Sequence, residues 1–145
     1  IKRPNLITEV SQRFGSQCMV LSIEAAKQKD GTWEAYTDNG REHSGYNVIE
    51  WSIEAEKLGA GEILLTSVDR DGTYKGFDLD LIEEVSNAVS IPVIASGGMS
   101  SPTDLCEVVK TAKADAVAIA SILHYEKFSV QEVKKEAIDL GIDIR

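Results

Sequence analysis

The sequence predicts an α/β fold built on a parallel sheet. Four short apolar runs alternate with segments that have the spacing of amphipathic helices. The run at residues 91–96 is almost entirely apolar, which is typical of a strand buried on both faces of a parallel sheet. It leads directly into Gly97 and Gly98, and a glycine pair at the end of such a strand lets backbone N–H groups approach an anion. The alternative is a tight turn without a ligand.

The composition predicts one cytoplasmic domain over residues 1–145. With 43% hydrophobic residues, the chain can bury a single core. The net charge of −9 argues against nucleic acid or an anionic membrane as the partner. No apolar run reaches the roughly 20 residues of a membrane span, and the first residues do not resemble a signal peptide. Cys18 and Cys106 lie in apolar segments, which favours buried, reduced thiols.

The first third of the chain predicts a helix, a strand and a hairpin. The helix covers residues 6–14 and, with no strand before it, resembles the end of a unit whose beginning is absent. A buried strand at 18–24 ends in the carboxylate of Glu24. Within the polar stretch 25–45, a strand-like run at 32–37 precedes an Asp-Asn-Gly turn. A polar insertion of about twenty residues in a compact domain more often has a function than not.

Three further strands complete the pattern, each followed by a helix. The elements after the hairpin are, in order, helix 48–58, strand 62–68, a polar loop at 69–76, helix 79–89, strand 91–96, helix 102–112, strand 115–123 and helix 130–140. Asp78 is expected to cap the helix that follows it. Ser129 and Glu132 are spaced as a capping box for the last helix.

Two folds fit this order: a small doubly wound sheet and part of a (β/α)₈ TIM barrel. A complete barrel takes roughly 200–250 residues, so this chain has room for only half of one. The alanines at positions 116, 118 and 120 suit a crowded barrel interior, although a flat sheet also accommodates them.

In both folds, ligands bind at the carboxyl ends of the parallel strands. The candidate residues there are Ser22, Glu24, Thr66, Asp69, Asp71, Ser96, Gly97, Gly98, Ser121 and His124. In (β/α)₈ barrels a phosphate site commonly lies between the loops after the last two strands. The pairs Gly97–Gly98 and Ala120–Ser121 occupy those places, and therefore predict phosphate binding.

Glu24 and Asp71 are expected to face the same opening at the carboxyl ends of the strands, where one carboxylate takes a proton while the other gives one. The alternative for Glu24 is an ion pair with Lys27 or Lys29, and the alternative for Asp71 is turn chemistry with Gly72.

No metal or cofactor is predicted. The run from Asp69 to Gly72 does not fit a calcium loop, because glycine stands at the fourth position and Asp80 at the twelfth. His43 is expected to be a solvated loop residue, and His124 to lie in a short helical turn. No pair of residues has the spacing of a zinc site.

Two segments together carry a family resemblance. Residues 59–73, GAGEILLTSVDRDGT, with residues 94–98, IASGG, closely resemble the cyclase subunit of imidazole glycerol phosphate synthase. The likeness covers essentially all 145 residues and corresponds to the second half of that family's barrel, strands five to eight.

The resemblance implies an ammonia-dependent cyclase and lyase of histidine biosynthesis. Ammonia from a glutaminase subunit would convert a phosphoribulosyl-formimino precursor into imidazole glycerol phosphate and an aminoimidazole carboxamide ribonucleotide. By the same resemblance, the phosphate site corresponds to Gly72, Gly98, Ala120 and Ser121, while Thr66 and Ser96 contact substrate. Asp71 matches an aspartate of the site, and Glu24 stands where the family has a catalytic aspartate.

The family's other catalytic aspartate lies on strand one, so the chain alone is expected to be inactive. Two other functions remain open. The chain could belong to a paralogue that passes ammonia to another acceptor, such as a surface sugar. It could also be a non-catalytic half-barrel that pairs into a dimer to cover its exposed strands.

Overall fold

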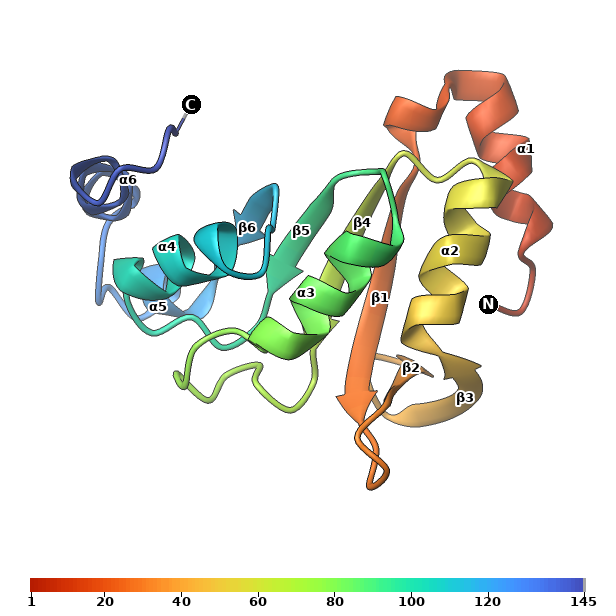
Figure 1. Ribbon diagram of the computed structural model, residues 1–145, viewed down its shortest axis with the longest axis horizontal. Helices are drawn as coiled ribbons and strands as arrows, with labels where there is room; N and C mark the ends of the chain where they lie inside the picture. The colour runs from red at the N-terminus through yellow and green to blue at the C-terminus, as the bar shows by residue number, and fades with distance from the viewer. Residues whose placement is uncertain (145) are drawn as a thin grey trace.

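Residues 1–144 are described by a computed structural model, in which six strands form one sheet in the order β3-β2-β1-β4-β5-β6 (Figure 1). The strands are β1 (Val20–Lys27), β2 (Trp33–Thr37), β3 (Glu42–Asn47), β4 (Glu62–Ser67), β5 (Val93–Ser96) and β6 (Ala116–Ala118). β1, β4, β5 and β6 run parallel, whereas β2 and β3 form an antiparallel hairpin beside β1. The predicted parallel sheet and the predicted hairpin are both confirmed.

Helices connect the parallel strands. In chain order they are α1 (Asn5–Phe14), the 3-10 turn η1 (Ser16–Cys18), α2 (Val48–Leu58), α3 (Leu79–Ala88), α4 (Pro102–Lys110), α5 (Ser121–His124) and α6 (Val130–Asp139). α2 packs beside α3, and α4 beside α6. Figure 1 shows α2, α3 and α4 on the same side of the sheet.

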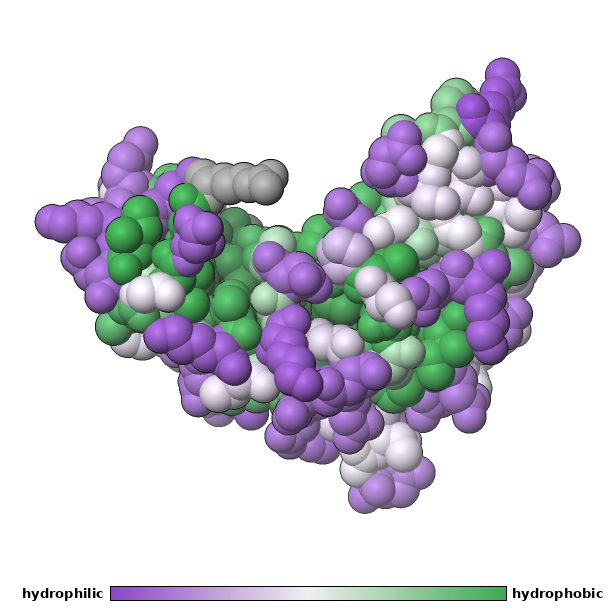
Figure 2. Space-filling model, turned by 45° about the horizontal axis from the view of Figure 1, so that its top comes forward, coloured by the Kyte–Doolittle hydropathy of each residue, from purple (hydrophilic) through white to green (hydrophobic). Residues whose placement is uncertain are grey.

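Only one face of the parallel strands is buried under helices. In β5, Val93 and Ala95 are buried, whereas Ile94 and Ser96 between them are partly exposed. β4 shows the same alternation along its length. The prediction that residues 91–96 are buried on both faces is therefore wrong within residues 1–144. Figure 2 shows the molecule hollowed between the end that carries α6 and the end that carries α1.

The ends of all five predicted strands differ from the structure, most of all those of the first and the last. The first strand continues past Glu24 to Lys27 and starts at Val20 rather than Cys18, because residues 16–18 form the 3-10 turn and leave Cys18 exposed, contrary to the prediction of a buried thiol. Cys106 is buried as predicted. The last strand ends at Ala118 instead of Leu123. There the backbone N–H of His124 donates to the carbonyl of Ala120 at 2.9 Å and turns the chain into α5.

A buried carboxylate joins the hairpin to the carboxyl edge of the sheet. Asp78 caps α3 as predicted, since its Oδ1 accepts a hydrogen bond from the backbone N–H of Leu81 at 3.3 Å. Its Oδ2 accepts from the indole N–H of Trp33 on β2 at 3.2 Å and from the hydroxyl of Ser67 on β4 at 3.4 Å. One side chain therefore holds β2, β4 and α3 together beside the candidate site.

The predicted capping box at the start of α6 is present, and it makes stability depend on pH. The carboxylate of Glu132 accepts hydrogen bonds from the Ser129 backbone N–H at 2.7 Å and hydroxyl at 2.8 Å. These two bonds lower the pKa of Glu132 from its usual value near 4.5. Because the folded pKa is the lower one, the stabilisation is present above pH 4.5 and is lost as the pH falls through the folded pKa.

We therefore expect Glu132→Gln to be less stable than the wild type at pH 7, and this difference to shrink at pH 3. Urea denaturation at the two pH values measures it, with Glu136→Gln on the same helix as the control. An equal difference at both pH values would contradict the assignment.

Candidate functional site

Three of the predicted site residues lie in one row across the parallel strands. The register pairs Glu24 with Thr66, Thr66 with Ser96, and Ser96 with Ala118. Side chains at paired positions project from the same face of a sheet. These positions alternate with the buried residues that face the helices, so the row lies on the uncovered face near the carboxyl ends of the strands.

A cavity of about 120 Å³ lies at the carboxyl ends of β5 and β6. Six predicted residues line it: Asp71, Ser96, Gly97, Gly98, Ala120 and Ser121. The structure therefore brings together the two segments that predicted a phosphate site, although they are separated by more than twenty positions of sequence.

The two glycines of this cavity are required by close backbone approaches. Both have positive φ, 91° at Gly97 and 100° at Gly98. A Cβ added to Gly97 would lie 2.9 Å from the carbonyl oxygen of Ser67 and 3.4 Å from the Cβ of Asp71. A Cβ added to Gly98 would overlap the carbonyl oxygen of Gly76. The loop after β4 is thus packed directly on the glycine pair.

The carboxylate of Asp71 is not used by the turn that contains it. The backbone N–H of Asp71 donates to the carbonyl of Ser67 at 2.9 Å. The turn itself is closed by Thr73, whose hydroxyl donates to the carbonyl of Arg70 at 2.7 Å. Within residues 1–144, the Asp71 side chain forms no hydrogen bond or ion pair, so it is available at the cavity.

A wider cavity of about 710 Å³ adjoins the first and shares Asp71, Ala120 and Ser121 with it. Gly72 lines this cavity, together with Tyr74, His124, Tyr125 and Lys127. The Lys127 ammonium lies 3.5 Å from the centre of the Tyr74 ring and brings a positive charge to the entrance. Sequence reasoning missed both residues, and the one local feature of Tyr74, its positive φ of 56°, is a property of the folded backbone.

Glu24 lies apart from these two cavities. It lines a third cavity of about 310 Å³ beside β1, together with Tyr36 and Asp38 of the hairpin. The ion pairs formed within residues 1–144 do not include Glu24, and Lys27 pairs with Asp80 at 3.7 Å. Glu24 and Asp71 thus share the carboxyl edge of the sheet but line different cavities.

Among residues 1–144, no group of three or more His, Cys, Asp or Glu side chains is arranged to hold a metal ion. In the same part of the chain, no helix has the length and apolar character needed to cross a membrane.

The fold and the cavities define an α/β protein with a glycine-walled site at the carboxyl edge of a parallel sheet. More specifically, the chain belongs to the histidine biosynthesis protein family, whose model matches residues 1–129. It is 46% identical, over all of its 145 residues, to the imidazole glycerol phosphate synthase subunit HisF of Streptococcus sanguinis (strain SK36) and to that of Streptococcus gordonii (strain Challis). The HisF subunit of Prochlorococcus marinus (strain AS9601) is also 46% identical, over 147 aligned positions.

The chain spans 57–58% of the length of these curated relatives. The 46% identity over the whole chain confirms the resemblance to a cyclase subunit.

Proposed function

We propose that this segment forms part of an ammonia-dependent cyclase and lyase of histidine biosynthesis. The reaction would produce imidazole glycerol phosphate and an aminoimidazole carboxamide ribonucleotide from a phosphoribulosyl-formimino precursor, with ammonia supplied by a glutaminase subunit. One observation carries the proposal. Six residues predicted to form the phosphate and substrate site line a single cavity in a chain 46% identical to HisF subunits.

In this proposal the glycine-walled cavity binds a phosphate group of the substrate. Backbone N–H groups hold the phosphate there, and Lys127 adds a positive charge at the entrance. Thr66 and Ser96 present hydroxyls from the same row of the sheet. The net charge of −9 fits recognition of the phosphate by the backbone rather than by a basic patch.

The two carboxylates would handle protons during ring closure. Ammonia that adds to a carbon atom must lose protons, and the amine that leaves must gain one. Asp71 lines the phosphate cavity from the loop after β4, and Glu24 lies on β1, the strand that pairs with β4. Two carboxylates on neighbouring strands suit one proton donor and one proton acceptor for a substrate that lies across these strands.

We further infer that the sheet is the second half of a (β/α)₈ barrel, strands five to eight. The four parallel strands follow one another in chain order, and one face of the sheet lacks helices. A doubly wound sheet would have a reversal of strand order and helices on both faces. The remaining length of the relatives would supply the strands that close the barrel, so the 145-residue segment alone is expected to be inactive.

The test is turnover of the phosphoribulosyl-formimino precursor by the full-length natural protein that contains this segment, with ammonium chloride as the nitrogen source. We expect both products to form, and only when ammonium is present. Binding of inorganic phosphate, followed by ³¹P NMR, is measured in parallel. Phosphate binding without turnover would reject the histidine-pathway reaction and favour a paralogue with another ammonia acceptor.

A further inference from the structure

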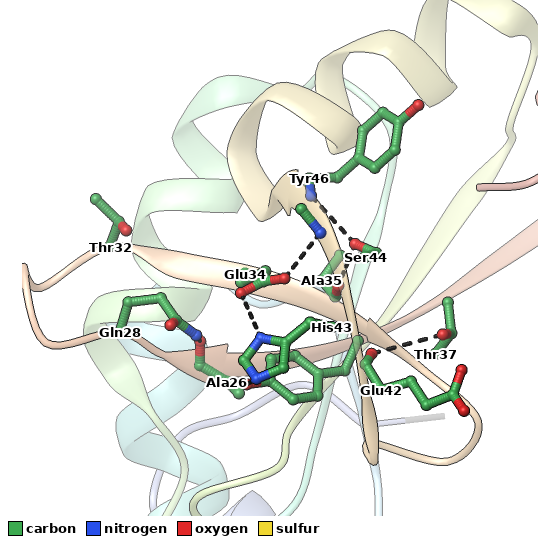
Figure 3. Close-up of polar contacts among 12 residues, drawn as sticks. Ala26, Gln28, Thr32, Glu34, Ala35, Thr37, Glu42, His43, Ser44 and Tyr46 are labelled. Atoms are coloured by element: carbon green, nitrogen blue, oxygen red, sulfur yellow. Dashed lines mark hydrogen bonds and ion pairs between the residues drawn. The ribbon is translucent and has the colours of Figure 1, made fainter.

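The hairpin carries a hydrogen-bonded group of side chains that the proposed reaction does not use. His43 on β3 places its Nδ1 2.9 Å from Oε2 of Glu34 and its Nε2 3.1 Å from the hydroxyl of Tyr36, both on β2. Figure 3 shows Glu34 and His43 pointing toward each other from the two strands. With its proton on Nδ1, His43 donates to Glu34 and accepts from Tyr36. We call Glu34, Tyr36 and His43 the hairpin network.

The hairpin network has more contacts, and a less exposed carboxylate, than an ordinary surface ion pair. The Glu34 side chain is only 16% exposed, and its second oxygen accepts from the backbone N–H of Gly45 at 2.8 Å. The hydrogen bond from His43, followed by that from Gly45, holds the pKa of Glu34 below its usual range. The rings of Tyr36 and His43 also stack at a tilt, with their centres 4.6 Å apart. Contrary to the prediction, His43 is therefore a hydrogen-bonded strand residue, although its side chain is 69% exposed.

The turn of the same hairpin lies against Glu24. A Cβ added to Gly40, whose φ is 74°, would lie 3.7 Å from Oε2 of Glu24 and 3.0 Å from a methyl group of Val68. The turn therefore lies beside one carboxylate oxygen of Glu24. It also leaves no room there for a residue larger than glycine without displacing Val68.

His43, Tyr36 and Glu24 occupy paired positions on the neighbouring strands β3, β2 and β1. The register pairs His43 with Tyr36, and Tyr36 with Glu24. Tyr36 and Glu24 therefore project from the same face, and both line the 310 Å³ cavity. A register shift between Ala35 and Tyr36 brings His43 opposite Tyr36. Movement of β3 relative to β2 would move both the turn and the Tyr36 ring beside Glu24.

We propose that His43 and Glu34 are positioning residues for Glu24. Their hydrogen bond locks β3 to β2, which holds the hairpin turn and Tyr36 against the Glu24 carboxylate and fixes its direction. The inference rests on the proposed function in one respect, since it takes Glu24 as a proton-transferring group. Glutamate has a longer and more flexible side chain than aspartate, and a displacement of about 1 Å can cost on the order of a hundredfold in rate.

The test compares His43→Ala, His43→Asn and Glu34→Gln in the full-length natural protein. Alanine removes both contacts of the imidazole. Asparagine keeps an N–H donor where Nδ1 lies, and can restore the contact with Glu34. Asn87→Ala is the matched control, because it removes an exposed hydrogen bond, donated by the Lys113 ammonium at 2.8 Å, from a residue of α3 that lines neither the Glu24 cavity nor the hairpin network.

We expect His43→Ala and Glu34→Gln to lower kcat about tenfold with little change in KM. We expect His43→Asn to remain within about threefold of the wild type. In protein labelled with ¹³C at glutamate carboxyl groups, the Glu24 signal, assigned with Glu24→Gln, should move in His43→Ala and stay in place in Asn87→Ala. Phosphate binding should be unchanged in every variant.

Two results would overturn the inference. One is a His43→Ala protein that is less stable but keeps the wild-type kcat and Glu24 signal, since the network would then be purely structural. The other is a parallel loss of kcat and phosphate binding, which would mean that the hairpin supports the whole site. If the wild type does not turn over the precursor, the proposed function fails, and the Glu24 signal alone decides whether the network positions that carboxylate.

Discussion

Replacing Glu24 with glutamine is expected to lower kcat for ammonia-dependent ring closure by about a hundredfold or more, with KM nearly unchanged. The amide has almost the same size as the carboxylate but cannot accept or release the proton, and general acid–base catalysis typically contributes about 10²–10⁴-fold. KM should be preserved because the phosphate cavity is lined by residues of other strands and loops. Steady-state kinetics of the full-length protein at saturating ammonium measure both constants.

Glu24→Asp is the matched variant, because it keeps the charge and withdraws it by one methylene group. A role in proton transfer predicts that aspartate retains far more activity than glutamine. The double variant with Asp71→Asn tests whether the two carboxylates act in one step. If they do, it should lose little more activity than the worse single variant, because residues that act as a unit are not additive. A Glu24→Gln protein within fivefold of the wild-type kcat would contradict the assignment.

The position of the cavity at the end of β5 was predictable from sequence because its signals are local. An apolar strand that runs into Gly97 and Gly98 defines both the strand end and the backbone that can approach an anion. The same holds for the caps at Asp78 and Ser129, each of which acts within three residues. Such features depend on chain geometry over a few positions, so the structure reproduces them.

The hairpin network was not predictable, because it depends on register. The turn chemistry predicts a hairpin, but the irregularity between Ala35 and Tyr36 decides that His43 lies opposite Tyr36. The contact between Tyr74 and Lys127 joins two loops whose approach requires the whole sheet. No pattern in the sequence specifies either pair.

Two predictions made from apolar runs were wrong, because such a run specifies neither the length of a strand nor whether both of its faces are buried. Residues 115–123 are nearly continuous in hydrophobic character, yet the strand stops at Ala118 and a helical turn begins at Ser121. Such runs do not distinguish a strand from a short buried helix. Residues 91–96 indicated burial on both faces, but Ile94 lies on the face without helices. An apolar residue there fits a surface that the rest of a longer protein would cover.

Gly98→Ala is expected to abolish measurable binding of inorganic phosphate and to lower the free energy of unfolding by about 2–6 kcal/mol, from backbone strain and steric overlap together. The φ of 100° disfavours any side chain, and the added Cβ would overlap the carbonyl oxygen of Gly76 and lie 2.9 Å from the Cβ of Arg70. The Gly76 N–H also donates to the Gly98 carbonyl at 2.9 Å. The loop after β4 would have to move, and Asp71 would move with it.

Gly31→Ala is the control that separates the cost of backbone strain from the cost of steric overlap. Gly31 has a φ of 91°, but a Cβ added there meets no atom within 4 Å, so this variant carries the backbone cost alone. It should lose about 1–2 kcal/mol and keep phosphate binding unchanged. Urea denaturation and ³¹P NMR of both full-length variants measure the two effects. If Gly98→Ala loses no more stability than Gly31→Ala and still binds phosphate, the close approach of Gly98 and Gly76 does not form the anion site, and the cavity assignment is wrong.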